Sequence, residues 1–263
     1  MSSKKVSYDS LKGLIKTDCN IKIFDELEST NITAKSEAKN GAPEGTIIIA
    51  RSQTGGRGRL GRNFYSPKDS GIYLSIILRP DIPIKDIILI TPTAAVAAAL
   101  AIETVTNKSP KIKWVNDIFV NGKKVCGILS EAAFSENCTA AEYIILGMGI
   151  NLTTPEGGFP KDIKDIAGSI YNYDELPNTN ELIASIINNF LRLYGDLNNK
   201  NTKDEYQKRM LLIGNSVNYT QNGEKYSGTV LGIDEGFKLI VKNASDEIIY
   251  LESGEATIGS GNI

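Results

Sequence analysis

A loop rich in glycine and arginine, SQTGGRGRLGR at residues 52–62, separates two apolar segments and limits the folds open to this chain. The segments GTIIIA at 45–50 and GIYLSIILRP at 71–80 both have the composition of buried strands. The loop has the Gly-x-Gly-x-x-Gly spacing of dinucleotide-binding loops, which a helix must follow because its N-terminus binds the pyrophosphate. Pro67 and the glycine that opens the next strand leave no room for such a helix. The sequence therefore disfavours a Rossmann fold.

The arginines of this loop carry more information than its glycines. Arg57, Arg59 and Arg62 lie close enough to repel one another, and the glycines between them let backbone N–H groups approach a ligand. A solvated surface loop would also contain glycine and arginine. A protein kinase loop would require a lysine on the next strand and a histidine in the catalytic loop, and the sequence has neither. We favour a flexible flap that becomes ordered around a polyanion.

The order of apolar and polar segments predicts an α+β fold, a mixed β-sheet with helices packed on it. The pattern predicts strands at 21–30, 45–50, 71–80 and 141–152, and three strands with two turns at 111–134, where Asn121-Gly122 marks a hairpin. It predicts helices from 29–31 to about 39, at 86–106, at 180–197 and around 206–212. Beyond Gly214, short strands alternate with turn residues. We therefore expect a main domain over 1–213 and a small β-barrel over 214–263.

Composition restricts the chemistry of the chain. The 263 residues are 41% hydrophobic and 23% charged, so the chain can bury a substantial core. The net charge of −2 gives no global attraction to nucleic acid or to an anionic membrane. Histidine is absent, which excludes imidazole-activated nucleophiles and imidazole metal ligands. Lysine, arginine, carboxylates or backbone groups must carry any chemistry.

The N-terminal segment and the cysteines predict a protein of the reducing cytoplasm. No signal peptide is expected, because MSSKKVSYDSLKGLIKTD lacks an apolar core. The longest apolar stretch, at 93–102, is too short to span a bilayer. Cys19, Cys126 and Cys138 have no metal-binding spacing and are expected to be free thiols.

Four further motifs each allow a purely structural interpretation when taken alone. KWVND at 113–117 contains the only tryptophan, a core residue in that interpretation, and an Asn-Asp pair typical of a turn. Lys124, in KKVCGILSE, flanks a hairpin strand. The glycines of GMGINL at 147–152 indicate a bulge or a close backbone approach, and STN at 29–31 is typical of a helix N-cap.

Taken together and in this order, the motifs ESTN, SQTGGRGRLGR, KWVNDI, KKVCGIL and GMGINL resemble those of the biotin protein ligases. The resemblance runs from about Ile23 to Leu152 and continues more weakly towards the C-terminus. It implies an enzyme that converts biotin and ATP to biotinyl-5′-AMP and pyrophosphate, and then transfers biotin to one lysine of a carboxylase carrier domain. It also implies a class II synthetase-like mixed sheet with helices on one side, followed by a small Src-homology-type barrel.

The resemblance assigns roles to individual residues. It implies that biotin is bound by Ser29, Thr30, Asn31, Gln53, Arg57, Gly58, Arg59, Lys124 and Gly127. It implies that ATP is bound by Gly56, Arg59, Arg62, Phe64, Lys113, Asn116, Asp117, Lys124 and Asn151. The implied catalytic residues are Lys124, Arg59 and Asp117, with Lys124 bridging the biotin carboxylate and the α-phosphate. Leu60 and Phe64 replace Arg and Trp of some members, and Phe64 keeps an aromatic surface.

This chemistry needs no histidine, because the nucleophilic carboxylate is already ionised at neutral pH. A carboxylate and a phosphate repel each other, by about 4 kcal/mol for unit charges ~4 Å apart at an effective dielectric constant near 20. Lys124, Arg59, Arg62 and the Mg²⁺ that accompanies ATP would offset that repulsion, and no residue is assigned as a metal ligand. Because an acyl-adenylate hydrolyses in water, a flap that orders over it has a clear use.

The residues alone leave other functions open. A lipoate–protein ligase would share the fold, but members of that family have in common an Arg-Arg and glycine-rich segment with a histidine. This chain contains no histidine. A non-catalytic biotin-binding module is less compatible with the lysines and arginines on the phosphate side. No DNA binding is expected, since only about twenty residues precede the first strand, too few for a helix-turn-helix domain. The expected partner is a carrier domain and not a membrane, and an exposed strand edge leaves a homodimer open.

Overall fold

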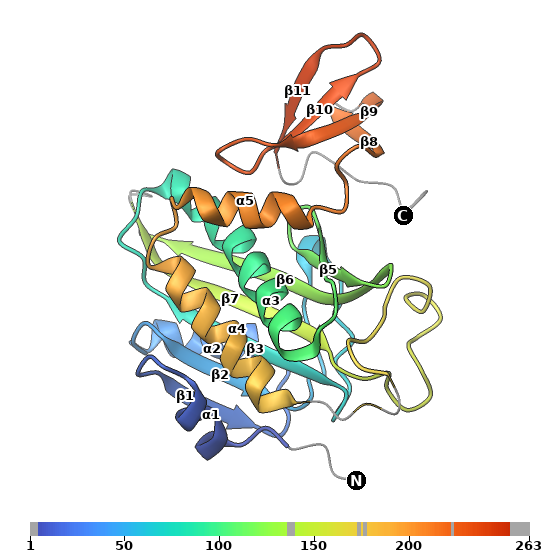
Figure 1. Cartoon of the computed structure of the whole chain (residues 1–263). Helices are drawn as coiled ribbons and strands as arrows, with labels where there is room; N and C mark the ends of the chain where they lie inside the picture. The colour runs from blue at the N-terminus through green and yellow to red at the C-terminus, as the bar shows by residue number, and fades with distance from the viewer. Residues whose placement is uncertain (1–4, 136–139, 173–174, 176–177, 222–223, 253–263) are drawn as a thin grey trace.

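The computed structural model describes residues 5–135, 140–172, 175, 178–221 and 224–252. A seven-stranded sheet with its helices makes the larger part of the molecule, and a four-stranded sheet follows it (Figure 1). Helix α1 and strand β1 lie at the end of the molecule opposite the small sheet (Figure 1). The predicted α+β class is confirmed.

The elements have the following bounds, with η denoting a 3₁₀ turn. The helices are α1 (Tyr8–Leu14), α2 (Thr30–Lys39), η1 (Arg59–Gly61), η2 (Ile84–Leu89), α3 (Ile90–Thr106), α4 (Thr179–Tyr194) and α5 (Lys200–Arg209). The strands of the large sheet are β1 (Asn20–Phe24), β2 (Thr46–Ala50), β3 (Gly71–Leu78), β4 (Lys111–Lys113), β5 (Asp117–Val120), β6 (Lys123–Phe134) and β7 (Ala141–Asn151). Those of the small sheet are β8 (Ser216–Gln221), β9 (Glu224–Ile233), β10 (Leu239–Asn243) and β11 (Ile248–Leu251).

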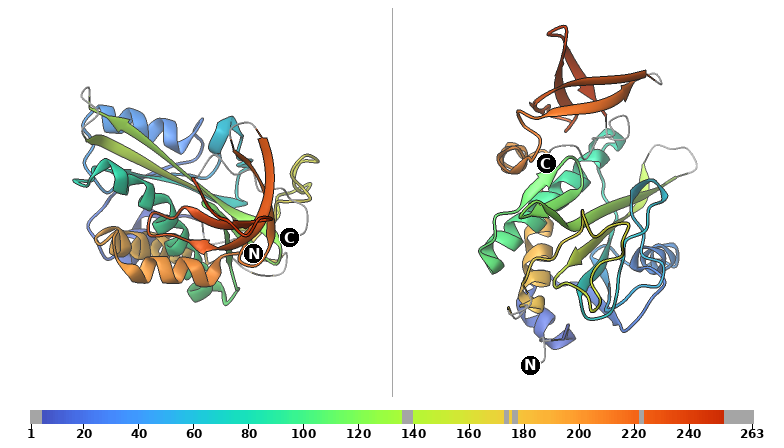
Figure 2. Two further views of the ribbon diagram at one scale, coloured as in Figure 1. Left: turned by 90° about the horizontal axis from the view of Figure 1, so that it is seen from above. Right: turned by 90° about the vertical axis from the view of Figure 1, so that its right-hand side faces the viewer.

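The large sheet is mixed and is covered by helices on both faces. Its order is β1-β2-β3-β7-β6-β5-β4, in which β1 and β2 are parallel and the other neighbours antiparallel. Successive side chains of a strand point to opposite faces. Ile47 and Ile49 pack in the core that contains α3 and α4, whereas Ile48 packs with Ala34 and Ala38 of α2. Helix α2 therefore covers the face opposite α3 and α4 (Figure 2), and the implied placement of all helices on one side is wrong, because the central strands are apolar on both faces.

Helix α3 is the central helix of the core. Its run of alanines favours the helix and lets the sheet and α4 approach closely. The continuous helical stretch Ile84–Thr106 is long and apolar enough to cross a membrane, and 67% of its most apolar window is buried inside the molecule. The expectation based on residues 93–102 alone underestimated the length of this stretch, because the flanking turns continue the same apolar face.

The small sheet has the order β11-β10-β9-β8 and is antiparallel throughout. A closed barrel requires pairing between its first and last strands. Over the described residues β8 and β11 are not neighbours, so the strands are confirmed and the closed barrel is not seen. The indole Nε1 of Trp114 donates a 2.8 Å hydrogen bond to the carbonyl of Phe237, between β9 and β10, and connects this sheet to the large one. The boundary between residues 213 and 214 stays a prediction.

Several elements differ from the prediction for local reasons. The strand predicted at 21–30 ends at Phe24, after which the chain turns and brings Leu27 beside Gln53. The helix predicted around 206–212 spans Lys200–Arg209, because Leu211 instead donates its backbone N–H to Ile112 at the sheet edge. The short helix α1 was not predicted. As expected, the loop at 52–62 leads to strand β3 and not to a long helix.

The predicted hairpin and free thiols lie where expected. Asn121 and Gly122 have φ angles of 51° and 73°, as the tight turn between β5 and β6 requires. Cys19 and Cys126 are buried free thiols, and burial raises the pKa of Cys126 to about 12. Cys138 lies outside the described residues.

Candidate functional site

The candidate site lies on the α2 face of the large sheet, beside the first residues of that helix. Two rows of paired residues cross β3, β7 and β6 there, namely Ser75–Gly147–Leu129 and Tyr73–Gly149–Gly127. Because side chains alternate along a strand, both rows face the same side as α2. The serine and the glycines have little or no side chain, so this part of the face stays open beside the start of α2.

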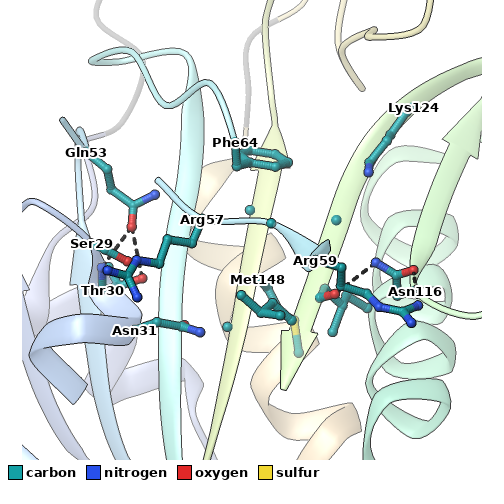
Figure 3. Close-up of a pocket in the computed structure, with 16 residues that line it drawn as sticks. Ser29, Thr30, Asn31, Gln53, Arg57, Arg59, Phe64, Asn116, Lys124 and Met148 are labelled. Atoms are coloured by element: carbon teal, nitrogen blue, oxygen red, sulfur yellow. Dashed lines mark hydrogen bonds between the residues drawn. The ribbon is translucent and has the colours of Figure 1, made fainter. Parts of the chain in front are cut away.

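Hydrogen bonds hold the closed end of this hollow rigid. The N–H of Thr30 donates to Gln53 Oε1 at 2.8 Å, and the Thr30 hydroxyl lies 3.1 Å from the same oxygen (Figure 3). The buried Ser75 hydroxyl lies 2.8 Å from Thr30 Oγ1 and 2.6 Å from Asn31 Oδ1. Asn31 Nδ2 donates to Glu131 Oε2 at 2.7 Å. Polar side chains from several elements thus meet at the start of α2.

The glycine-arginine loop forms an irregular hairpin beside the hollow. Phe64 donates its N–H to Gly56 O at 2.9 Å, and Gly58 donates to Arg62 O at 2.7 Å. Gly56 has no room for a side chain, since a Cβ there would lie 2.4 Å from the Phe64 carbonyl oxygen. Leu60, at the tip, has a φ of 56° and is 81% exposed. The loop is therefore tightly turned at its base and open to solvent at its tip.

Side chains of this loop reach both ends of the site. Arg57 extends towards Thr30, whereas Arg59 extends the other way and its Nη1 donates to Asn116 Oδ1 at 3.0 Å (Figure 3). The ring of Phe64 lies over Gly149, where a Cβ would come within 2.5 Å of the ring. The glycines of GMGINL do allow a close approach to the backbone, by the side chain of Phe64 at Gly149 and by that of Asn31 at Gly147, where a Cβ would lie 2.0 Å from Oδ1.

Charged groups gather where β5 and β6 pair. Lys124 Nζ lies 2.7 Å from Asp117 Oδ2 in a half-buried ion pair. Asn116 Nδ2 donates to Asp117 Oδ1 and to Ile128 O, both at 3.0 Å. The backbone therefore orients Asn116, and Asn116 in turn orients Asp117 against Lys124.

Positive charge exceeds negative charge in this cluster. Burial lowers the pKa of Lys113, the carboxylate of Asp117 raises it, and the charges of Lys124 and Arg62 lower it further. Lys113, Lys124 and Arg62 thus act on one another electrostatically, with Asp117 as the carboxylate among them. Such a surplus of positive charge suits a polyphosphate better than a neutral ligand.

Two adjoining pockets contain these residues. With open solvent included in both volumes, the inner pocket, at the start of α2, spans about 460 Å³ and the outer pocket, beside Lys113, about 1450 Å³. The inner pocket is lined by every residue predicted to bind biotin: Ser29, Thr30, Asn31, Gln53, Arg57, Gly58, Arg59, Lys124 and Gly127. The outer pocket is lined by most residues predicted to bind ATP: Arg59, Arg62, Phe64, Lys113, Asn116, Asp117, Lys124 and Asn151.

The pockets meet at a small set of shared residues. Both are lined by Gly58, Arg59, Phe64, Asn116 and Lys124. Ligands bound in the two pockets would therefore meet beside Lys124 and Arg59. Gly56 is the predicted ATP-binding residue that lines neither pocket, and it serves instead at the base of the loop hairpin.

Sequence reasoning missed one wall of the outer pocket. Apolar side chains of Phe159, Ile163, Ile166 and Ala167 line it opposite the cations. Lys124 donates its backbone N–H to Ile166 O at 2.8 Å, so this segment is attached to the start of β6. Apolar residues three or four apart in a loop were the available signal, and that signal is too general to assign a site. Trp114, expected in the core, is buried and also lines this pocket.

Comparisons with known proteins identify the family of this chain. The model of the Biotin/lipoate A/B protein ligase family matches residues 23–151. The bifunctional ligase/repressor BirA of Bacillus subtilis is 37% identical over 255 residues, covering 94% of this chain and 78% of that protein. The chain belongs to the biotin protein ligase family. The family model covers the motifs on the large sheet, and the match to the Bacillus subtilis protein extends beyond that sheet.

Two further relatives agree with this assignment. The biotin–[acetyl-CoA-carboxylase] ligase of Mycobacterium tuberculosis is 27% identical over 237 residues, covering 84% of this chain and 85% of that protein. A biotin protein ligase from Aquifex aeolicus, solved in complex with biotin and ATP, has a TM-score of 0.74 and 25% identity, covering 91% of this chain and 98% of that one. The chain is thus a ligase of this family.

Proposed function

We propose that this chain is an ATP-dependent biotin–protein ligase that binds biotin in the inner pocket and ATP in the outer pocket. The observation that carries the proposal is the junction of the pockets at Lys124 and Arg59, next to a surplus of positive charge. The related ligase solved with biotin and ATP supports the same pair of ligands. The residue roles given below are part of the proposal.

The first step joins the two ligands at the junction. A carboxylate oxygen of biotin attacks the α-phosphorus of ATP, the bond from that phosphorus to the bridging oxygen breaks, and pyrophosphate leaves. Lys124 and Arg59 lie where the carboxylate and the phosphate meet, and they offset the repulsion between the two anions. Lys113 and Arg62 extend the positive surface along the outer pocket, towards the leaving pyrophosphate. No general base is required, because the carboxylate is ionised.

ATP enters, in this proposal, as its Mg²⁺ complex. Proteins commonly hold such an ion through one or two carboxylates and the substrate's own phosphates. Asp117 is the carboxylate that lines the outer pocket, and its oxygens also contact Asn116 and Lys124. Among the described residues no group of three His, Cys, Asp or Glu side chains is placed to hold a metal. The site therefore fits an ion carried by the phosphates, whose charge that ion would neutralise.

The second step transfers biotin to a lysine. The uncharged amine attacks the carbonyl carbon of biotinyl-5′-AMP, an amide bond forms, and AMP leaves with the former carboxylate oxygen. Asp117, the carboxylate beside Lys124, is assigned as the group that accepts the proton lost by the amine, and the loop at 52–62 covers the intermediate from water. The relative named as a biotin–[acetyl-CoA-carboxylase] ligase supports a carboxylase carrier domain as the acceptor.

Lipoate is the main alternative ligand within the matched family model. The closed end of the inner pocket is polar, with Thr30, Asn31 and Gln53 facing one another, whereas the disulfide ring of lipoate offers few hydrogen bonds. That polarity favours the ureido ring of biotin. A binding module without catalysis would have no use for the cations of the outer pocket.

The test is a reaction of the chain with Mg²⁺-ATP, a carboxylase carrier domain, and either biotin or lipoate. We expect the mass of the carrier to increase by one biotin on one lysine, with pyrophosphate and AMP as products. Addition of lipoate in preference to biotin, or binding of biotin with no ATP consumption, would overturn the proposal.

A further inference from the structure

The hydrogen-bond partners of Asn31 determine which way its amide points. Asn31 Nδ2 lies 2.7 Å from Glu131 Oε2, and a carboxylate only accepts hydrogen bonds. The amide nitrogen must therefore face Glu131, and Oδ1 must face the Ser75 hydroxyl, 2.6 Å away. Ser75 is fully buried, and its hydroxyl donates towards Asn31 Oδ1 and Thr30 Oγ1. One N–H of Nδ2 is left over, and Asn31 extends into the inner pocket (Figure 3).

The amide of Gln53 is fixed in the same way. Its Oε1 accepts from the backbone N–H of Thr30 at 2.8 Å, and its Nε2 donates to Ser66 Oγ at 2.9 Å. Ser66 gives its own hydrogen to the Phe64 carbonyl at 2.9 Å, so it accepts from Gln53. Gln53 thus presents an oxygen to Thr30.

The hydroxyl of Thr30 gives its hydrogen to Gln53 Oε1, 3.1 Å away. Its oxygen accepts from the Ser75 hydroxyl at 2.8 Å. The hydrogen of Thr30 therefore points into the protein. Thr30 offers the pocket an acceptor, while Asn31 beside it offers a donor.

We propose that Ser75 and Glu131 are specificity-determining positioning residues of the inner pocket. They orient Thr30 and Asn31 so that the pocket receives a ligand with an N–H next to a C=O, as in a cyclic urea. A cyclic guanidinium of the same shape offers only N–H donors and leaves the donor of Asn31 opposed by another donor. This inference rests on the proposed function, since it assigns the ureido end of biotin to this end of the pocket.

Replacement of Glu131 by glutamine removes the restriction and keeps the volume. A glutamine side chain can accept from Asn31 or donate to it. If Asn31 turns over, its Nδ2 donates to Ser75, its Oδ1 accepts from the glutamine, and every group stays paired. The pocket then presents an acceptor that suits a guanidinium. Ser75→Ala instead removes the donor to Asn31 Oδ1 and leaves that buried oxygen unpaired in the wild-type orientation.

The experiment is titration calorimetry with biotin and with 2-iminobiotin, which carries a guanidinium in place of the urea, at neutral pH. We expect the wild type to prefer biotin by at least a hundredfold. Glu131→Gln should bind biotin within about threefold of wild type, and its preference should fall at least tenfold. Ser75→Ala should bind biotin about tenfold more weakly and also lose preference, whereas the KM for ATP should stay within twofold for both variants.

Matched controls separate orientation from general destabilisation. Thr46→Val removes another buried hydroxyl, on β2, whose 2.8 Å partner is Pro43 O, and Glu142→Gln removes an exposed carboxylate on β7. Both controls should keep the wild-type preference. An unchanged preference in Glu131→Gln and Ser75→Ala would overturn the inference while leaving the ligase activity intact. Failure of the proposed function would instead appear as no biotin-dependent pyrophosphate release by the wild type.

Discussion

Removal of the Lys124 ammonium group should disable the first step of the reaction. Lys124 lines both pockets, and its Nζ lies 2.7 Å from a carboxylate oxygen of Asp117. A unit charge ~4 Å from the reacting anions contributes about 4 kcal/mol at an effective dielectric constant near 20. Since about 1.36 kcal/mol corresponds to a factor of ten in rate, Lys124→Ala should lower kcat/KM for adenylate formation roughly 10³-fold. Asp117, without its partner, would add repulsion in the same direction.

The assay is biotin-dependent release of pyrophosphate at saturating Mg²⁺-ATP. Lys123→Ala is the matched control, because the neighbouring lysine donates to Asp165 O at 2.6 Å and lines neither pocket. Both variants should melt within a few degrees of wild type, since the Lys124–Asp117 pair keeps 29% and 24% of its side chains exposed and such a pair contributes on the order of 1 kcal/mol. Pyrophosphate release by Lys124→Ala within threefold of the control would refute the role of this charge.

Three further predictions concern Arg59 of the loop, Gly149 beneath the ring of Phe64, and Lys113 of the outer pocket. Arg59→Gly should still form the adenylate, more slowly because one of the two offsetting charges is lost, but should lose it to solvent, which would be measured as biotin on bystander lysines. Gly149→Ala should displace the ring of Phe64, because the new Cβ would lie within 2.5 Å of it, and should raise the KM for both biotin and ATP about tenfold in steady-state assays. Lys113→Met should raise the KM for ATP and also raise Tm at pH 7, because burial lowers the pKa of Lys113 and the folded protein disfavours its charged form. Burial of the charged Lys113 lowers the free energy of unfolding of the wild type. This loss should disappear as the pH rises from the lowered pKa of Lys113 to the ordinary value of 10.5. Lys111→Met, on the same strand, should change neither the KM nor Tm.

Each of these predictions has an opposite outcome that would count against it. Retention of the adenylate by Arg59→Gly as tightly as by wild type would rule out the covering role of the loop. Unchanged KM values in Gly149→Ala, with circular dichroism confirming the fold, would show that Phe64 does not shape the pockets. A lower Tm in Lys113→Met would mean that packing of its aliphatic stem outweighs the burial of its charge.

The sequence predicted the residues that line the pockets better than the residues that hold those side chains in position. Lys124, Arg59 and Thr30 lie in motifs whose residue types suit anions and polar rings, so pattern and chemistry pointed the same way. Ser75 lies in the apolar segment GIYLSIILRP, where one serine has no distinguishing context, and its partners come from another element. Glu131 likewise resembles any carboxylate near the end of a hairpin strand. Partners of this kind depend on tertiary contacts that local patterns do not encode.

The larger differences also arise from tertiary contacts. The continuous apolar runs of β2 and β7 are typical of strands covered on both faces, but they do not determine which helix covers which face, so the position of α2 required the structure. The short strands of the C-terminal region were predicted from turn residues, but sequence spacing does not determine whether the outer strands of a sheet pair. The apolar residues at 159–167 lie three or four apart, a spacing too general to assign a site, and their place in the outer pocket followed only from the attachment of this segment to Lys124.

In the proposed reaction the two pockets join biotin to the α-phosphate of ATP at Lys124. A single-turnover reaction with ATP labelled at the α-phosphate, in the presence of biotin and in the absence of any carrier, tests this step directly. We expect a burst of one pyrophosphate per chain and an equal amount of labelled biotinyl-5′-AMP bound to the protein. Release of orthophosphate and ADP, or a burst that does not depend on biotin, would contradict it.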